Sequence, residues 1–209
     1  MGYTISSMDS FKLSHNLHFA EEATGIAGKG DMVVIDTAEI GTTVELLKRG
    51  VVATDIRFIN RCKKQVIVAQ KAVSGLKGHA VTFNQFAKSS YRNDIRAAYV
   101  DSCSSFSNLE DGLKALFTKK LFVHKAVLFL TCTFRQDCTS VDAKLYRAWK
   151  KDGIVEFATD TPVVKKANCL LTEMAWQAGY RLSRYTPVKV PDAHYRHGVY
   201  LLRYVILKL

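Results

Sequence analysis

The regular alternation of short apolar runs with helical segments constrains the fold more than any other feature of this sequence. Residues 31–57 read DMVVIDTAEIGTTVELLKRGVVATDIR. An apolar run ends in Asp36, a short loop containing Gly41 follows, and a stretch of helical periodicity leads to a second apolar run ending at Asp55. Short β-branched runs of this kind are typical of buried strands. The stretch therefore predicts a strand, a helix and a second strand.

The same alternation continues to the end of the chain. Strands are predicted over 32–36, 51–56, 79–83, 95–101 and 125–134, with helices over 8–28, 42–50, 59–76, 109–122, 143–153 and 167–179. Two final strands, 180–190 and 199–209, are joined by PDAHYRHG and predict a hairpin. The order predicts an α/β fold: a seven-stranded, mostly parallel, doubly wound sheet with a C-terminal antiparallel hairpin and helices on both faces. We expect one domain over 1–209, with 1–30 as an N-terminal helical lead-in.

Composition excludes several classes of protein. Hydrophobic residues make up 48% of the 209 residues and the mean hydropathy is −0.02, which is typical of a globular chain. No apolar run approaches the roughly 18 residues of a membrane span, and no apolar signal core follows a basic start. We expect no membrane association and a cytoplasmic or nuclear location. The five cysteines include no Cys-x-x-Cys pair, so no metal site is predicted and the thiols are expected to be reduced.

The charge balance points to an anionic partner. Thirty Lys and Arg oppose nineteen Asp and Glu, giving a formal net charge of +11. A basic surface attracts polyanions, nucleic acid among them. A basic protein without such a partner is the alternative.

Ligands of a parallel α/β sheet bind beyond the carboxyl ends of the strands, so the residues that follow each strand are the candidates for a site. These are residues 36–42, 55–57, 84–85, 101–105 and 131–135.

The complete order of elements, including the closing hairpin, resembles a class I S-adenosylmethionine-dependent methyltransferase over about residues 10–209. The first motif of that family reads acid-x-Gly-x-Gly-x-Gly, and here Asp36, Ala38, Glu39 and Gly41 occupy the corresponding stretch. The tail IGTT is similar to the Gly-Ser-Gly-Thr-Thr ending of several DNA methyltransferase loops. The resemblance implies S-adenosylmethionine as cofactor, with these four residues in its binding loop.

Further cofactor contacts are implied by the same resemblance. Asp55 follows Asp36 by 19 residues, the usual spacing for an acid that accepts the ribose hydroxyls. Asn84 or Gln85 would approach the adenine, and Asp101 would complete the cofactor set. The alternative is that Asp36 and Asp55 are helix caps in a fold without a cofactor.

Two chemistries are open at the end of the fourth strand, which reads VDSCSSF. In many nucleic-acid methyltransferases this position holds Asp/Asn-Pro-Pro-Tyr/Phe, and Asp101 would correspond to its polar head, which accepts the target amine. RNA cytosine-5 methyltransferases instead carry one cysteine after strand four and another after strand five, similar to Cys103 and Cys132. A thiolate would then attack the ring carbon next to the methyl acceptor.

Basic residues interleaved with aromatic ones follow the fifth strand, a pattern that suits phosphates and stacked bases. The predicted nucleic-acid-binding residues are Arg135, Arg147, Lys150, Lys151 and, in the hairpin loop, Arg196. Three functions remain open: a nucleic-acid methyltransferase, a methyltransferase-like protein without catalysis that serves as a nucleic-acid-binding or partner subunit, and a small-molecule methyltransferase. A protein partner or homo-oligomer is possible in each.

Overall fold

The computed structural model describes residues 10–37, 39–89, 94–133, 162–184, 188–190 and 199–209. Helices in these ranges are α1 (Ser10–Gly25), α2 (Gly41–Lys48), α3 (Lys63–Ala72), α4 (Phe83–Lys88), α5 (Phe106–Thr118) and α7 (Pro162–Gln177). The strands are β1 (Asp31–Ile35), β2 (Ile56–Ile59), β3 (Lys77–His79), β4 (Ile95–Ser105), β5 (Phe122–Thr133), β6 (Tyr180–Arg184), β7 (Val188–Val190) and β8 (Val199–Lys208).

All of these strands belong to one sheet, whose order is β3-β2-β1-β4-β5-β8-β6, with β7 pairing β8. The first five strands run parallel, and β8 runs antiparallel to both β5 and β6. The predicted α/β class, the mostly parallel sheet and the antiparallel C-terminal pair are confirmed. The predicted strand 180–190 forms two strands, β6 and β7; the sequence between them contains Pro187, which has no N–H for a sheet ladder.

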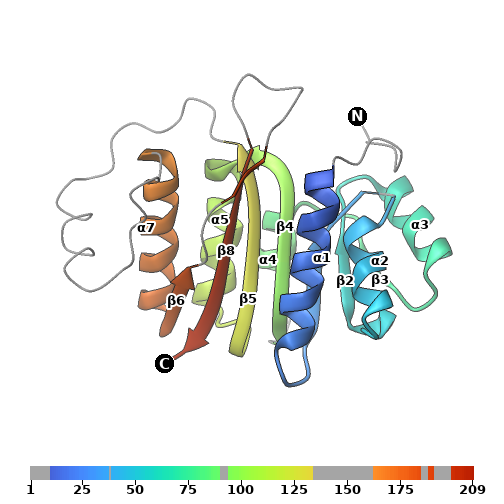
Figure 1. The fold of residues 1–209 in the computed structure, drawn as a ribbon, viewed down its shortest axis with the longest axis horizontal. Coiled ribbons are helices and arrows are strands. Elements are labelled where there is room, and N and C mark those ends of the chain that lie inside the picture. Colours follow the sequence, from blue (N-terminus) through green and yellow to red (C-terminus); the bar gives the residue numbers. More distant parts are fainter. Residues whose placement is uncertain (1–9, 38, 90–93, 134–161, 185–187, 191–198) are drawn as a thin grey trace.

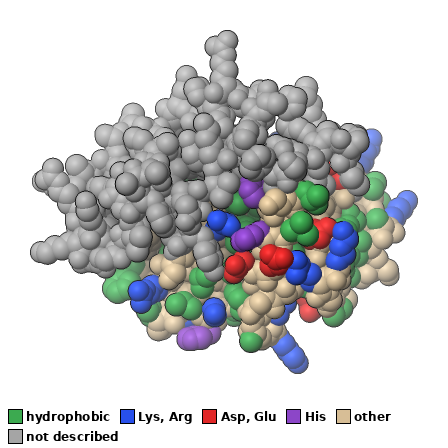
Figure 2. All heavy atoms as spheres, viewed as in Figure 1, with side chains coloured by type: hydrophobic (Ala, Val, Ile, Leu, Met, Phe, Trp, Pro, Cys, Tyr) green, Lys and Arg blue, Asp and Glu red, His purple; other side chains and the backbone are tan. Residues whose placement is uncertain are grey.

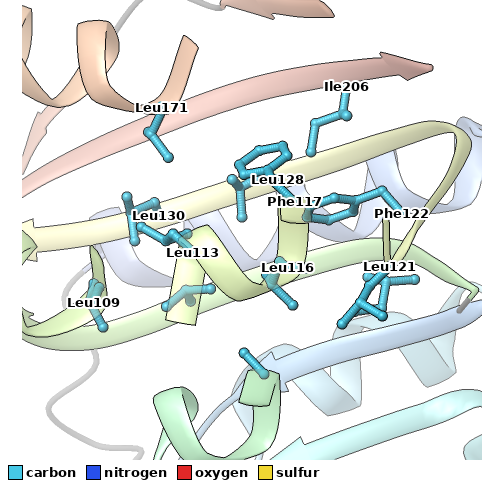
Figure 3. Close-up of a cluster of buried hydrophobic side chains, with 14 of the residues drawn as sticks. Leu109, Leu113, Leu116, Phe117, Leu121, Phe122, Leu128, Leu130, Leu171 and Ile206 are labelled. Atoms are coloured by element: carbon cyan, nitrogen blue, oxygen red, sulfur yellow. The ribbon is translucent and has the colours of Figure 1, made fainter. Parts of the chain in front are cut away.

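Helices cover both faces of the sheet (Figure 1). One face packs against α1, α2 and α3 in a cluster that includes Phe19, Leu46 and Val66. The other face packs against α4, α5 and α7, and Figure 3 shows part of this second cluster, in which Leu109, Leu113, Leu116 and Phe117 of α5 lie among side chains of β5, β8 and α7. Fully burying one such side chain stabilises the fold by about 1.5–3 kcal/mol, so the two clusters fix which helix lies on which face.

The predicted strand 51–56 is wrong in its position. Val51 is buried, Val52 is exposed, and Ala53–Asp55 form a 3-10 turn before β2 begins at Ile56. The register explains the shift, because Met32 at the start of β1 pairs with Ile56. Residues 51–55 are therefore used to return the chain from the end of α2 to the amino edge of the sheet.

The predicted strand 79–83 is also wrong. Strand β3 ends at His79, and Thr82 begins α4 with a capping box: the Thr82 hydroxyl accepts from the Gln85 N–H, and the Gln85 side chain accepts from the Thr82 N–H. A Thr-x-x-Gln pattern is a recognised helix start, and it outweighs the apolar character of this segment. The predicted helix 143–153 lies outside the described residues.

Within the described part of the chain, no helix is both long and apolar enough to cross a membrane.

Close packing of α4 on α5 depends on Gly112. A Cβ at this position would lie 2.5 Å from Asn84 Oδ1 and 2.6 Å from Phe83 Cε1. The same Asn84 oxygen accepts the Gly112 N–H at 3.0 Å, and the Asn84 amide donates to the Asn108 carbonyl at 2.9 Å. The two helices are thus joined where no side chain fits.

We predict that Gly112→Ala lowers the free energy of unfolding by about 1–3 kcal/mol, because the added methyl group displaces Phe83 and Asn84. Gly25→Ala is the matched control, since a Cβ on this helical glycine meets nothing within 4 Å, and it should be neutral or slightly stabilising. Chemical denaturation measures both. Equal stability of the two variants would contradict the packing argument.

Candidate functional site

Four polar residues lie in one row at the carboxyl edge of the sheet. Ile35, the last residue of β1, pairs with Ile59 of β2 and Val100 of β4, and Asp101 pairs with Thr131 of β5. The next residues of the strands are therefore level with one another: Asp36, Asn60, Asp101 and Thr131. The strand order reverses between β1 and β4, so the row spans the point where sheets of this type bind ligands.

Asp36 fixes the loop that follows β1. Its side chain is buried, and one carboxylate oxygen accepts the N–H groups of Thr42 at 2.9 Å and Thr43 at 3.2 Å, while the other accepts the N–H of Thr37 at 3.0 Å. Thr42 and Thr43 belong to the first turn of α2, where backbone N–H groups have no helical partner and the helix dipole favours a negative charge. Asp36 thus caps α2 from the preceding strand.

The loop reaches its left-handed turn without a glycine. Ile40, directly before α2, has φ 49° and ψ 32°, whereas Gly41 is the first helical residue. A β-branched residue rarely adopts this conformation, so the backbone at Ile40 is strained. Its side chain is buried, and the Thr37 hydroxyl donates to the Glu39 carboxylate at 3.4 Å. Ala38 lies outside the described residues.

Asn60, and not Asp55, stands at the carboxyl end of β2. Asp55 precedes the strand, is exposed, and lies at the opposite edge of the sheet from Asp36, so the prediction that it ends the second strand is wrong. The Asn60 amide donates to the Asp36 carbonyl at 2.8 Å and to Gln65 Oε1 at 2.6 Å, and its oxygen accepts the Cys62 N–H at 2.8 Å. Sequence reasoning missed Asn60 because it placed the strand five residues too early.

Asp101 lies beside Thr131, whose hydroxyl donates to Asp101 Oδ1 at 2.5 Å. Thr131 is buried, so this bond fixes the carboxylate of Asp101 at the edge of the sheet. Thr131 lies in the candidate stretch 131–135 but had no predicted role; its register opposite Asp101 is the signal that gives it one. The register shifts between Asp101 and Ser104, so Cys103 lies in an irregular stretch of β4. Cys132 of β5 pairs with Ser104 of β4.

Asn84 and Gln85 do not join this row. Asn84 links α4 to α5, and Gln85 caps α4, so both have structural contacts. The predicted nucleic-acid contacts Arg135, Arg147, Lys150, Lys151 and Arg196 lie outside the described residues. No group of three or more potential metal ligands occurs among the residues that are described.

His79 extends the edge beyond β2. It pairs with Ile59, its carbonyl accepts the Asn60 N–H at 3.1 Å, and its ring contacts Phe86 at a centroid distance of 5.2 Å. Burial lowers the pKa of His79 below its usual value, and the charges of Arg57 and Lys77 lower it further, against a smaller opposing effect of Asp31. The ring is therefore neutral near pH 7.

The comparisons with known proteins identify the architecture. Neither a family model nor a curated protein sequence matches the chain. Solved structures do match it. The N-methyltransferase NodS from Bradyrhizobium japonicum is 12% identical with a TM-score of 0.55, and the alignment covers 96% of this chain and 99% of NodS. The chain has the class I methyltransferase fold.

Two further structures share this fold at equally low identity. TYW2 from M. jannaschii, solved in complex with AdoMet, is 12% identical with a TM-score of 0.54, covering 93% of this chain and 76% of TYW2. Trm5b from Pyrococcus abyssi is 8% identical with a TM-score of 0.56, covering 93% of this chain and 48% of Trm5b. NodS has also been solved with S-adenosyl-L-homocysteine.

The lowered pKa of His79 predicts a loss of stability in mild acid. As pH falls through the ordinary histidine pKa of about 6.5, the unfolded chain takes up a proton before the folded one. The free energy of unfolding therefore decreases. The contribution is fully present above that pH. Urea denaturation at pH 7.5, 6.5 and 5.5 should show a smaller acid-induced loss in His79→Gln than in the wild-type protein. Identical pH profiles would contradict the prediction.

Proposed function

We propose that this chain is an S-adenosylmethionine-dependent methyltransferase that acts on nucleic acid. The observation that carries the proposal is the buried Asp36 carboxylate capping α2 at the switch point of a sheet with the methyltransferase fold. Two proteins of this fold were solved with AdoMet or its demethylated product bound.

The residues of the carboxyl edge suit the parts of such a cofactor. The loop from Asp36 to Gly41 leads into the positive end of the α2 dipole, where a carboxylate is favoured. Asn60 occupies the strand end next to this loop, and we assign it the ribose contact previously expected of Asp55. We assign Glu39 a contact with the amino-acid portion of the cofactor.

The cofactor, when bound, supplies an electrophilic methyl group; the chain must orient the acceptor. Asp101, fixed by Thr131, can accept a hydrogen bond from an acceptor amine and so direct the amine lone pair. Cys103 is the competing candidate, as a nucleophile toward a pyrimidine ring, with Cys132 assisting release. The net charge of +11 supports a polyanionic substrate over a small neutral one.

A second candidate function is a binding subunit that keeps this fold without catalysis. Both N–H groups of the Asn60 amide already donate to protein oxygens, and no acid stands at the end of β2. Ile40 holds the strained position of the loop where a glycine would be unstrained. These observations favour weak cofactor binding or none.

Calorimetric titration with S-adenosylhomocysteine separates the two functions. We predict binding by the wild-type protein, and a loss of about 2- to 12-fold in Asn60→Ala, the range for one neutral hydrogen bond. Asp55→Ala is the matched control: because Asp55 is exposed at the opposite edge, its affinity should stay within about twofold. No binding by the wild type would favour the non-catalytic subunit. A loss confined to Asp55→Ala would refute the assignment of Asn60.

Methyl transfer to mixed RNA and DNA, measured with labelled cofactor, tests the reaction centre. We predict that Asp101→Asn and Asp101→Ala abolish transfer while affinity for S-adenosylhomocysteine stays within about tenfold, or roughly 1.4 kcal/mol. Thr131→Val should lower kcat, since it releases the Asp101 carboxylate.

Cys103→Ser distinguishes the two chemistries. It should keep most activity if an amine is the acceptor and lose it if the thiolate is the nucleophile, in which case a 5-fluorocytosine oligonucleotide would form a covalent adduct with the wild type. Full activity of Asp101→Ala would exclude this end of β4 as the reaction centre.

A further inference from the structure

One segment of the chain has basic residues and no acidic ones. From residue 56 to residue 93 the sequence contains no Asp or Glu. This segment forms β2, α3, β3 and α4, and its strands β3 and β2 are the last two at one end of the sheet (Figure 1). Its basic residues are Arg57, Arg61, Lys63, Lys64, Lys71, Lys77, Lys88 and Arg92.

Ion pairs account for only part of this charge. Arg57 pairs with Asp31 at 2.7 Å, and Lys88 pairs with Asp111 at 2.6 Å. By contrast, four exposed basic side chains of α3 and of the residues just before it form no ion pair with any residue that the structure describes. They are Arg61, Lys63, Lys64 and Lys71. We call these four residues the α3 surface.

Two aliphatic side chains lie between these charges on the outside of α3. Ile67 is 42% exposed and Val68 is 51% exposed. Lys64, Val68 and Lys71 follow one another at helical spacing, so the lysines stand on one face about 10 Å apart along the helix. The opposite face of α3 packs into the core through Val66 and Ala69.

The α3 surface begins beside the candidate site. Arg61 directly follows Asn60, and Lys63 opens α3 at the carboxyl edge of the sheet. The helix then runs away from that edge along the outside of the molecule (Figure 1). Figure 2, viewed from the same side, shows Lys and Arg side chains on the rim where α3 lies.

We infer that the α3 surface binds the sugar–phosphate backbone of a nucleic acid and leads it to the carboxyl edge of the sheet. The inference rests on the proposed function and assigns its substrate a place of contact besides the one that the sequence predicts after β5. Ammonium groups bind phosphates as point charges without reading sequence, and α3 carries no aromatic side chain on which a base could stack. The contact is therefore one with phosphates and not with bases.

An anionic membrane would also attract lysines, but the surface suits it less well. Interfacial helices bury a broad apolar face, whereas the outer face of this ten-residue helix offers two partly exposed aliphatic side chains. Nucleic acid is also the ligand that can extend from α3 to the row of Asp36 and Asp101.

A charge-matched pair of triple variants tests the inference. The test protein carries Lys63→Gln, Lys64→Gln and Lys71→Gln. The control carries Lys114→Gln, Lys125→Gln and Lys208→Gln, three exposed lysines on other elements, so both proteins lose the same net charge. Thermal melts confirm that each is folded. Binding of a fluorescent 20-nucleotide single strand of random sequence is measured by anisotropy without cofactor from 25 to 300 mM salt.

We expect the test protein to bind at least tenfold more weakly than the wild type at low salt. Its slope of log affinity against log salt should be smaller by about 2, which corresponds to the loss of roughly three phosphate contacts on a single strand. The control protein should stay within about threefold of the wild type. In methyl transfer, the test protein should show a raised KM for nucleic acid and an unchanged kcat.

Four outcomes would overturn the inference. If the test protein binds like the wild type, or if the control loses as much affinity, α3 does not bind phosphates, while the proposed function stands on cofactor binding and methyl transfer. If the wild type binds no oligonucleotide at low salt, both the α3 surface and the nucleic-acid substrate are excluded. If the wild type binds vesicles containing phosphatidylserine in preference to the oligonucleotide, and the test protein does not, the partner is a membrane.

Discussion

The bonds of the Asp36 carboxylate with the first turn of α2 are the interaction on which this end of the molecule depends. They join the central strand β1 to α2, and the Thr42 hydroxyl then donates to Asn16 Oδ1 of α1 at 3.1 Å, with both residues buried. The Asn60 amide, at the end of β2, donates to the Asp36 carbonyl and so joins β2 to the same residue. One residue therefore sets the positions of two strands and two helices. Hydrogen bonds to a charged group stabilise by about 1.5–3 kcal/mol each, so this junction is also strong.

That junction explains how the loop holds a left-handed turn at a residue other than glycine. A left-handed backbone at a residue such as Ile40 costs roughly 1–2 kcal/mol. Burial of the Ile40 side chain and the cap that Asp36 supplies to α2 together offset a cost of this size. The path of the chain is thus held by packing and by one carboxylate, where glycine would have allowed it without strain.

The sequence predicted the fold well where its segments were long and periodic. The strands that became β1, β4 and β5, and the helices that became α2, α5 and α7, have continuous apolar patterns that tertiary packing does not override. The errors fell on the short strands β2 and β3 at one end of the sheet. Their register is set by pairing with β1 and β2, which a single sequence does not reveal, and the apolar run at 51–56 was used for a connection instead.

The candidate-site residues were predicted correctly where their strands were, and wrongly where the strand was misplaced. Asp36 directly follows β1 as expected, because the position of that strand was predicted correctly. Asp101 is level with it but lies within β4, which continues to Ser105 beyond the predicted end at residue 101. Asp55 was misplaced and Asn60 overlooked for the same reason, a shift in one strand. The Thr82–Gln85 capping box was visible in the sequence and would have placed the start of α4 correctly. The contact of Thr131 with Asp101 could be predicted only once the pairing of β4 with β5 was known.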